Sequence, residues 1–378
     1  MISSVLKEYS TQLKQKGLHR KRMLAGSVEG SVLINFSSND YLSLAENADI
    51  SAAFQRGFAN YPSGSGGSMV ICGYHPIHKD LERAFSDALN ADDALLFSSG
   101  YAANLGVIAL LAKAKAQVFI DKGAHASCYD GLELAKANYS RFLHNDFESL
   151  AGKLQSAQAK HPVVLTESVF SMSGHASNLS ELRAICGHFN ADCIIDEAHA
   201  FGVLGPQGLG AVAEHGLSQQ DIPLRIIPLG KAFAAQGAMV VGQGEWIDAL
   251  LQSARSHIYS TAVSPALAYG LLEILTFIQA ADDRRQKLFE LIHYFQQSCV
   301  NSPLNWRHSN TPIQQLRLGC PHKALAYATS LRSAGIFCQA MREPTVNKKD
   351  TGLRVVLNYH HEPEQIDYLF SKLHELAI

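Results

Sequence analysis

The sequence lacks several features that mark common classes of protein. Its net charge is −2, so it has no excess of basic residues such as nucleic-acid-binding proteins carry. No apolar run approaches the roughly 20 residues needed to span a bilayer. Residues 1–22 mix charged and apolar side chains without the apolar core of a signal peptide. We therefore expect a cytoplasmic protein with neither a nucleic-acid nor a membrane partner.

Cysteine is sparse and irregularly spaced. The seven cysteines include no Cys-x-x-Cys pair, which favours free thiols in a reducing compartment over a disulfide framework. Seventeen histidines raise the question of a metal site. The pair His75-Pro-Ile-His78 lacks the remaining ligands of a metal site, so we expect no metal.

The length and composition are those of a globular enzyme with two lobes. The chain has 378 residues, of which 47% are apolar and 17% charged. We expect three parts: residues 1–45 with a helix over Met1–Leu24 and a strand over Ser31–Phe36, a large domain over 46–280, and a small α+β domain over 281–378. The last boundary is placed at the charged segment Asp282–Arg285.

Short apolar segments alternate with helical segments through the middle of the chain. The expected strands are 94–97, 117–121, 163–166, 193–196 and 225–229, and the expected helices are 101–113, 180–189 and 264–277. Such alternation favours a buried, mostly parallel sheet, in which ligands bind at the carboxyl ends of the strands. Polar residues follow these strands: Ser99, Gly100, His125, Glu167, Ser171, Asp196, His199 and Lys231.

Lys231 and the cluster Asp196-Glu-Ala-His199 carry the clearest chemistry. A lysine after an apolar strand suits a Schiff base, and a buried carboxylate suits a protonated pyridine nitrogen. The alternative is that Asp196 has only a structural role, as an aspartate that caps the end of a strand. Asp-Glu-Ala-His also occurs in helicases, but those need a phosphate loop in which Ser or Thr follows Gly-Lys, and here Ala232 follows Lys231.

Two further segments fit the same site. Ser98-Ser-Gly-Tyr101 joins a strand to a helix, and the backbone N–H groups at a helix start bind phosphate. Tyr101 could equally be a packed aromatic residue. His125 follows the strand that ends at Asp121; it could be a core histidine, or it could lie on a cofactor ring.

Together these segments resemble the α-oxoamine synthases, pyridoxal-phosphate enzymes of the aspartate-aminotransferase fold type. The resemblance covers nearly the whole chain and rests on the segments Asn35–Leu42, Gly64–Ser68, Gly73-Tyr74, Ser99–Asn104, His144–Asp146, Thr166–Met172, Asp196–His199 and Ile258–Thr261. It implies an α/β fold, with a large domain whose mostly parallel seven-stranded sheet is sandwiched by helices and a smaller α+β C-terminal domain. It also implies a homodimer with the active site at the interface.

The resemblance assigns a role to individual residues. Lys231 would hold pyridoxal phosphate as a Schiff base and move the α-proton, Asp196 would pair with the pyridine nitrogen, and His125 would stack on the ring. The implied cofactor-binding residues are Gly100, Tyr101, His125, Glu167, Ser171, Asp196, His199, Lys231 and, from the partner subunit, Thr261. The implied substrate-binding residues are Arg20, Asn39, His125, Thr345 and Arg354.

The C-terminal lobe favours one branch of the family. Met341–Val346, Leu353-Arg354 and Thr311–Gln314 resemble the branch that joins L-alanine to a pimeloyl thioester in biotin biosynthesis. The acyl carrier, coenzyme A or a carrier protein, stays open. Either Arg20 or Arg22 would meet the distal carboxylate of the acyl group. The alternatives are a related synthase using glycine or serine, an aminotransferase, and a non-catalytic protein that kept the fold.

The chain departs from the family pattern at several positions. Pro228 stands where Thr or Ser usually donates a hydroxyl to the cofactor phosphate, which should cost on the order of 1.5–3 kcal/mol of cofactor binding. Phe201 occupies a position that is usually small. His175 ends Ser-Gly-His where Asp-Gly-Asp is common, and Ala235 stands where glycine is frequent. None of these changes removes a catalytic group.

Overall fold

The structure is a computed structural model that describes residues 2–23, 27–28, 31–157 and 159–377. The chain divides into two compact units. The small unit comprises Met1–Tyr41, Ser171–Gly174 and Gln286–Ile378, and the large unit comprises Leu42–Phe170 and His175–Arg285. The sequence placed residues 1–45 in a part of their own, whereas the structure groups those up to Tyr41 with the C-terminal residues.

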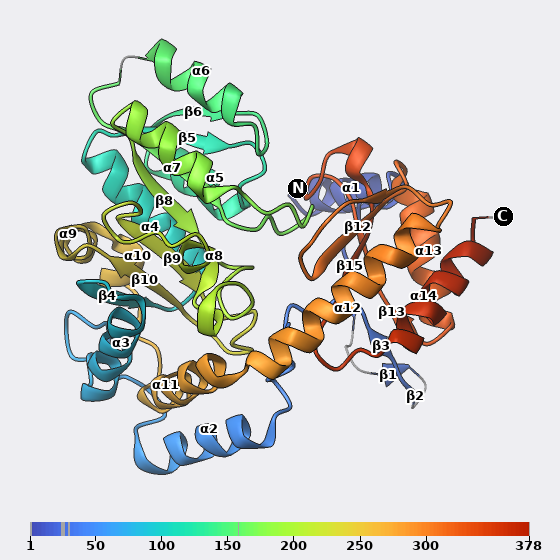
Figure 1. The fold of residues 1–378 in the computed structure, drawn as a ribbon, viewed down its shortest axis with the longest axis horizontal. Coiled ribbons are helices and arrows are strands. Elements are labelled where there is room, and N and C mark those ends of the chain that lie inside the picture. Colours follow the sequence, from blue (N-terminus) through green and yellow to red (C-terminus); the bar gives the residue numbers. More distant parts are fainter. Residues whose placement is uncertain (1, 24–26, 29–30, 158, 378) are drawn as a thin grey trace. The chain divides into compact units, whose positions relative to one another are not determined.

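The large unit is built on a seven-stranded sheet in the order β4-β10-β9-β8-β7-β5-β6 (Figure 1). The strands are β4 (Asp93–Phe97), β5 (Gln117–Asp121), β6 (Asn138–Phe142), β7 (Pro162–Glu167), β8 (Asp192–Asp196), β9 (Leu224–Pro228) and β10 (Ala238–Gly242). Only β10 runs antiparallel to its neighbours. The predicted mostly parallel sheet is therefore confirmed. Strands β6 and β10 were not among the segments read as strands from the sequence.

Helices precede, connect and follow the strands of this sheet. They are α2 (Ala48–Asn60), α3 (Pro76–Leu89), α4 (Gly100–Lys113), α5 (Ala126–Leu134), α6 (Phe147–Ala157), α7 (Leu179–His188), α8 (Gly210–Glu214), α9 (Gly244–Ser253), α10 (Arg255–Ile258) and α11 (Pro265–Ala280), with the 3-10 turn η1 (Pro206–Gly208). Helix α12 (Asp282–Val300) begins in the large unit and continues in the small one.

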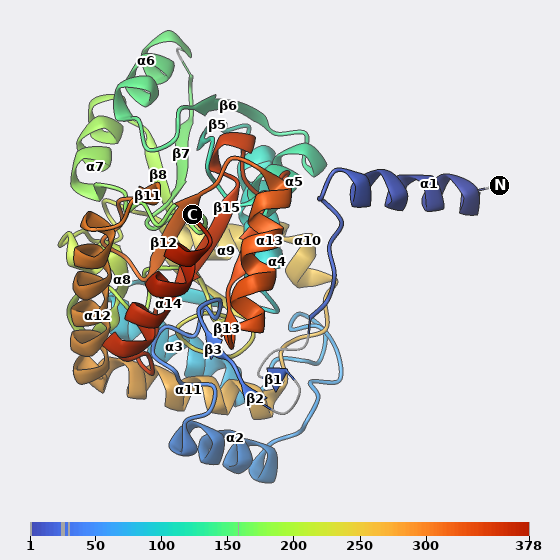
Figure 2. The same ribbon diagram turned by 90° about the vertical axis from the view of Figure 1, so that its right-hand side faces the viewer.

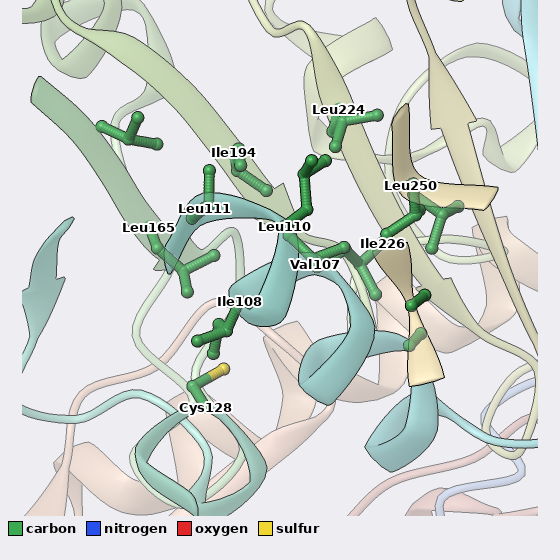
Figure 3. Close-up of a cluster of buried hydrophobic side chains, with 14 of the residues drawn as sticks. Val107, Ile108, Leu110, Leu111, Cys128, Leu165, Ile194, Leu224, Ile226 and Leu250 are labelled. Carbon is green, nitrogen blue, oxygen red and sulfur yellow. The ribbon is translucent and has the colours of Figure 1, made fainter. Parts of the chain in front are cut away.

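Helix α4 covers the middle of the sheet. Its residues Val107, Ile108 and Leu111 pack on Leu165 and Ile194 of β7 and β8 in one buried cluster (Figure 3). Because both faces of the central strands are buried, these strands are apolar at nearly every position instead of alternating with polar residues. This packing fixes the carboxyl ends of the strands, where the predicted site residues lie.

The small unit contains a four-stranded antiparallel sheet in the order β11-β12-β15-β14. Its elements are β11 (Trp306–Arg307), β12 (Ile313–Arg317), β14 (Gln339–Met341), β15 (Gly352–Val356), α13 (Pro321–Ser333), α14 (Pro363–Glu375) and the turn η2 (Lys348–Asp350). Helix α13 packs on β14 and β15, and α14 packs on α13 (Figure 2). Two small pairings complete the unit: β1 (Ser27–Val28) with β2 (Ser31–Val32), and β3 (Ile34–Asn35) with β13 (Ile336–Phe337).

The N-terminal helix is shorter than the sequence predicted. Helix α1 (Ile2–Gln15) ends well before Leu24, because Gly17 adopts a φ of +66° and the N–H groups of Leu18 and His19 turn back to the carbonyl of Leu13. The predicted end points Met1 and Leu24 lie outside the described residues. In the described part of the chain, no helix combines the length and hydropathy needed to cross a membrane.

Candidate active site

Asp196 is the last residue of β8 and is 4% exposed. Its Oδ1 accepts a hydrogen bond from the backbone N–H of Ala198 at 2.9 Å, and its Oδ2 accepts one from Nδ2 of Asn104 at 3.1 Å. Asn104 lies in α4 and is itself buried. Two donors therefore hold a buried carboxylate in one orientation at the carboxyl end of the central strand.

The same asparagine links Asp196 to the predicted stacking histidine. Its Nδ2 also donates to Oγ of Ser127 at 3.0 Å, and that oxygen lies 2.8 Å from Nδ1 of His125. Partial burial lowers the pKa of His125; the Asp196 carboxylate opposes this shift, and the Lys231 ammonium adds to it. His125 thus lies within electrostatic range of both predicted catalytic charges. The residue as a whole is exposed, which is compatible with a ligand stacked on its ring.

Lys231 lies in a tight loop between β9 and β10. The N–H of Leu229 donates to Gly237 at 2.9 Å, the N–H of Ala235 donates to Leu229 at 3.1 Å, and the N–H of Ala234 donates to the carbonyl of Lys231 at 2.7 Å. Ala234 has a φ of +50°, a conformation in which glycine costs less. The lysine is half-buried, and its backbone is held by the loop's own hydrogen bonds.

The unusual Phe201 packs beside this loop. Its ring stacks on Phe85 at 5.9 Å and on Phe233 at 5.8 Å, and those two rings lie 5.7 Å apart. Next to it, Gly202 has a φ of +87°, and an added Cβ would lie 2.5 Å from Cβ of Ala232. The large aromatic residue therefore belongs to a buried cluster that supports both residues after Lys231.

The start of α4 also lies over the end of β9. The Ser99 hydroxyl caps α4 by accepting from the N–H of Ala102 at 3.1 Å. A Cβ added to Gly100 would lie 2.7 Å from Cγ of Pro228, so only glycine fits there. Tyr101 is 45% exposed and donates its hydroxyl hydrogen bond to Asp130. The free N–H groups of this helix start, beside a strand end, suit an anion.

Glu197, inside the Asp-Glu-Ala-His segment, was not assigned a role from the sequence. It is fully buried and pairs with Arg225 of β9 at 2.7 Å, and it accepts from the N–H of Ala211 at 2.7 Å. Burial raises the pKa of Glu197, and the Arg225 guanidinium opposes the shift. An added Cβ at Gly210 would lie 1.9 Å from its Oε2. This pair joins β8 and β9 to the start of α8.

A hydrogen-bonded chain of side chains begins at Asp121, the last residue of β5, and was also not predicted from the sequence. Asp121 Oδ1 lies 3.0 Å from Nδ1 of His144, and Nε2 of His144 lies 3.1 Å from Nδ1 of His175. The two imidazoles stack with an interplanar angle of 9°. His175, a departure from the family pattern, thereby takes part in a structured network. In the sequence, the two histidines of His144-Asn-Asp146 and Ser173-Gly-His175 were the features that could have indicated this network.

The other residues predicted in the large unit occupy different environments. Glu167, the last residue of β7, is 3% exposed, and its backbone carbonyl accepts from the hydroxyl of Ser177 at 2.8 Å. His199 is 5% exposed and follows β8. Thr261 is exposed in the segment after α10. An exposed Thr261 is compatible with the contact to a second subunit that the sequence predicted, and that contact stays a prediction.

Arg354 of β15 is the centre of the predicted residues in the small unit. It is 5% exposed, its Nε donates to the carbonyl of Ser171 at 2.6 Å, and its Nη2 donates to Oδ1 of Asn39 at 2.9 Å. Burial raises the pKa of Tyr41 to about 12, opposed by the Arg354 guanidinium and its hydrogen bond to the Tyr41 hydroxyl. The structure thus brings Asn39, Ser171 and Arg354 together.

The remaining two predicted residues meet at the surface of the small unit. Nη2 of Arg20 donates to Oγ1 of Thr345 at 3.3 Å, and both residues are exposed. The sequence left open whether Arg20 or Arg22 meets the acyl substrate, and that stays a prediction. In the structure it is Arg20 that reaches Thr345.

Comparison with known proteins identifies the family. The family described as aminotransferase class I and II matches residues 31–373. The 8-amino-7-oxononanoate synthase of Marinobacter nauticus is 38% identical, over 96% of this chain and 93% of its own length. The chain belongs to the 8-amino-7-oxononanoate synthase family. That family is a branch of the pyridoxal-phosphate-dependent acyltransferases, and the predicted resemblance is confirmed.

Solved structures agree with this assignment. An 8-amino-7-oxononanoate synthase of Francisella tularensis superposes with a TM-score of 0.80 at 30% identity, covering 91% of this chain and 98% of that one. A serine palmitoyltransferase of Sphingomonas wittichii superposes with a TM-score of 0.90 at 25% identity, covering 99% and 96%. The large and small units therefore follow the fold of pyridoxal-phosphate acyltransferases.

The residues of the large unit fit pyridoxal phosphate. Asp196 is a buried carboxylate for the ring nitrogen, His125 an exposed residue for stacking, and Lys231 an amine at a strand end. The start of α4 offers backbone N–H groups for a phosphate, and Gly100 keeps that approach open. Pro228 contributes neither a hydroxyl nor an N–H. The protein is a pyridoxal-phosphate enzyme.

Proposed function

We propose that the enzyme condenses L-alanine with a pimeloyl thioester to give 8-amino-7-oxononanoate, carbon dioxide and the free thiol, in biotin biosynthesis. The observation that carries the chemistry is the buried Asp196 carboxylate, fixed by Asn104 and Ala198 at the end of β8. The choice of substrates rests on the name shared by the relatives.

Residues of the large unit would move the proton and hold the cofactor. When bound, pyridoxal phosphate supplies an electron-poor ring that accepts the electron pair left at Cα of the amino acid. The amine of Lys231 would take the Cα proton and later return one. Asp196 would hold positive charge at the ring nitrogen, and His199 would meet the phenolic oxygen. His125, kept neutral by its lowered pKa, would stack on the ring and stabilise charge on the thioester oxygen.

Other residues would hold the phosphate and shape the cofactor pocket. The N–H groups around Gly100 and Tyr101 would bind the phosphate, and Thr261 of a second copy would add its hydroxyl. Glu167 and Ser171 complete the proposed cofactor set. Such a contribution from a second copy makes the enzyme a homodimer in this proposal.

Residues of the small unit would recognise the substrates. Arg354 and Asn39 would bind the carboxylate of alanine, because a guanidinium already oriented by hydrogen bonds loses little freedom on binding. Arg20 would meet the distal carboxylate of the pimeloyl group, and Thr345 would line its path. The acyl carrier is coenzyme A or a carrier protein.

We also propose a cytoplasmic location. The seven cysteines are all free, and three of them are partly or fully accessible to solvent. Accessible free thiols persist in a reducing compartment.

The experiment that tests the function measures products from purified holoenzyme. With L-alanine and pimeloyl-coenzyme A we expect equal amounts of free thiol and carbon dioxide, and one new carbon–carbon bond in the product by mass. Glycine and L-serine serve as competing amino acids. A preference for serine would replace this substrate assignment with that of a serine-using synthase, and transfer of an amino group without thiol release would replace it with an aminotransferase.

A further inference from the structure

In the small unit, the segment that follows α1 has a defined path. Gly17 is buried, and a Cβ added to it would lie 3.1 Å from Cε1 of His322 at the start of α13. The N–H groups of Leu18 and His19 both donate to the carbonyl of Leu13, at 2.8 and 3.1 Å. The chain therefore leaves the helix in a fixed direction, across the ring of His322.

Arg342 holds this segment from the other side. Its Nη1 donates to the carbonyl of Gly17 at 2.7 Å and, at 3.5 Å, to the carbonyl of His19. Arg342 directly follows β14, and it is half-buried. Because the bonds are made to backbone carbonyls, Arg342 controls where the chain runs just before Arg20.

The same arginine begins the turn that carries Thr345. The N–H of Thr345 donates to the carbonyl of Arg342 at 3.0 Å, so the two residues keep a constant spacing. One turn thus makes two contacts with the N-terminal segment. Arg342 fixes the backbone, and Thr345 receives the guanidinium of Arg20 at 3.3 Å.

The positive charges of Arg20 and Arg342 also favour the binding of an anion near these two residues. Burial lowers the pKa of Arg342, and the neighbouring Arg20 guanidinium lowers it further. Among the described residues, neither guanidinium has an ion-pair partner. The nearest acidic residue in the turn is Glu343, which is exposed. Two converging cations repel each other, and a carboxylate between them would relieve that repulsion.

We propose that Arg342 is a positioning residue, which clamps the backbone at Gly17 and His19 so that Arg20 stays on Thr345 and reads the distal carboxylate of the acyl substrate. The identity of that carboxylate rests on the proposed function. The clamping of the segment does not, because it follows from contacts within the small unit.

The test combines proteolysis with substrate kinetics. In Arg342→Met holoenzyme we expect trypsin to cut after residues 20–22 at least about 10-fold faster, because cleavage tracks the population of the released segment. The KM for pimeloyl-coenzyme A should rise by about 10-fold with kcat within about 2-fold, the effect of one lost bond to a charged group. The Ki of octanoyl-coenzyme A, which has no distal carboxylate, should not change.

Two further variants separate the clamp from general damage. Thr345→Val keeps both backbone bonds of Arg342, so it should raise the KM for pimeloyl-coenzyme A without faster trypsin cleavage. Arg342→Lys keeps the positive charge and a hydrogen-bond donor group on a shorter side chain, so it should restore part of the protection. Lys21→Gln, an exposed neighbour, is the control for loss of charge and should leave KM unchanged.

Unchanged trypsin cleavage in Arg342→Met would overturn the clamp. Faster cleavage together with an equal change in the KM for pimeloyl-coenzyme A and in the Ki of octanoyl-coenzyme A would overturn the proposal that Arg20 recognises the distal carboxylate. If the wild-type enzyme does not turn over pimeloyl-coenzyme A at all, it is the proposed function that fails, and the cleavage rates by themselves then decide on the clamp.

Discussion

The residue proposed for catalysis and the residues proposed to recognise the acyl substrate are held in place in different ways. Asp196 is 4% exposed, ends a central strand and is fixed by two donors within the large unit. Arg20 and Thr345 are exposed and meet through one hydrogen bond of 3.3 Å in the small unit. The carboxylate proposed to act in the reaction is thus fixed by the packing of a sheet, whereas the proposed acyl contact depends on a few surface hydrogen bonds. Substrate choice can therefore change with little effect on the fold.

The difference between buried, multiply bonded residues and exposed, singly bonded ones is not a difference between the large and the small unit, as Arg354 shows. It lies in the small unit, yet it is 5% exposed and bonded to both Asn39 and Ser171. The amino-acid carboxylate is proposed to bind there. Burial and multiple partners therefore follow the part of the substrate that reacts, in either unit.

The largest effect should come from Lys231→Ala. We expect activity to fall by about 10²- to 10⁴-fold, because the variant loses the group that is proposed to move the proton. The melting temperature should hardly change, since the loop keeps its backbone bonds. Lys122→Ala, an exposed lysine after β5, is the matched control. Activity that survives in Lys231→Ala would remove the lysine from the proposed mechanism.

Glu197→Gln should be the most destabilising change near the site. It leaves the buried Arg225 charge without its carboxylate, and breaking a buried ion pair costs about 3–5 kcal/mol. Thermal unfolding should therefore begin several degrees lower. Glu214→Gln, an exposed residue at the end of α8, should have no such effect. Equal melting temperatures for the two variants would show that the pair does not support the sheet end.

Pro228→Thr should strengthen cofactor binding. The new hydroxyl would supply a hydrogen bond to the phosphate, worth about 1.5–3 kcal/mol, so the Kd for pyridoxal phosphate should fall by roughly 10- to 100-fold. Titration of the apoenzyme by absorbance measures this directly. Pro162→Thr at the start of β7 is the control. An unchanged Kd would mean that the start of α4 already satisfies the phosphate.

The pH dependence of stability can be compared between the two units, because each contains a buried histidine whose pKa is about 4. Burial lowers the pKa of His257 in the large unit and of His361 in the small unit to about 4, from 6.5. The neutral rings contribute stability that is complete above pH 6.5 and is lost as the pH falls toward 4. Between pH 7 and pH 5 each should cost roughly 2 kcal/mol of unfolding free energy.

His257→Leu separates the two contributions. The variant should lose less stability than the wild type between pH 7 and pH 5. The remaining loss should come from the other histidines whose pKa burial lowers, His361 of the small unit among them. Urea unfolding at both pH values measures the difference, with the exposed His293→Leu as control. If wild type and His257→Leu lose equal stability, the buried ring of His257 does not titrate as its burial requires.

Local pattern in the sequence was enough to predict much of the large unit. The residue ranges of β5, β7, β8 and β9 and of α4 and α7 were predicted to within about two residues, because a strand buried on both faces is a continuous apolar run. Asp196, Glu167 and Lys231 could be placed at the carboxyl ends for the same reason. The edge strand β6 is mostly exposed and contains the polar residues Asn138, Ser140 and Arg141, so it gave no such signal.

The sequence by itself determined five of the seven strands of the large sheet, the residues at their ends and the family, since these depend on short runs of neighbouring residues. Only the tertiary structure decided which distant residues meet. It joined Asn104 to Asp196, closed Gly100 on Pro228, and brought Arg20 rather than Arg22 to Thr345. Such contacts depend on side-chain packing at distances of a few ångströms, and no local pattern encodes them.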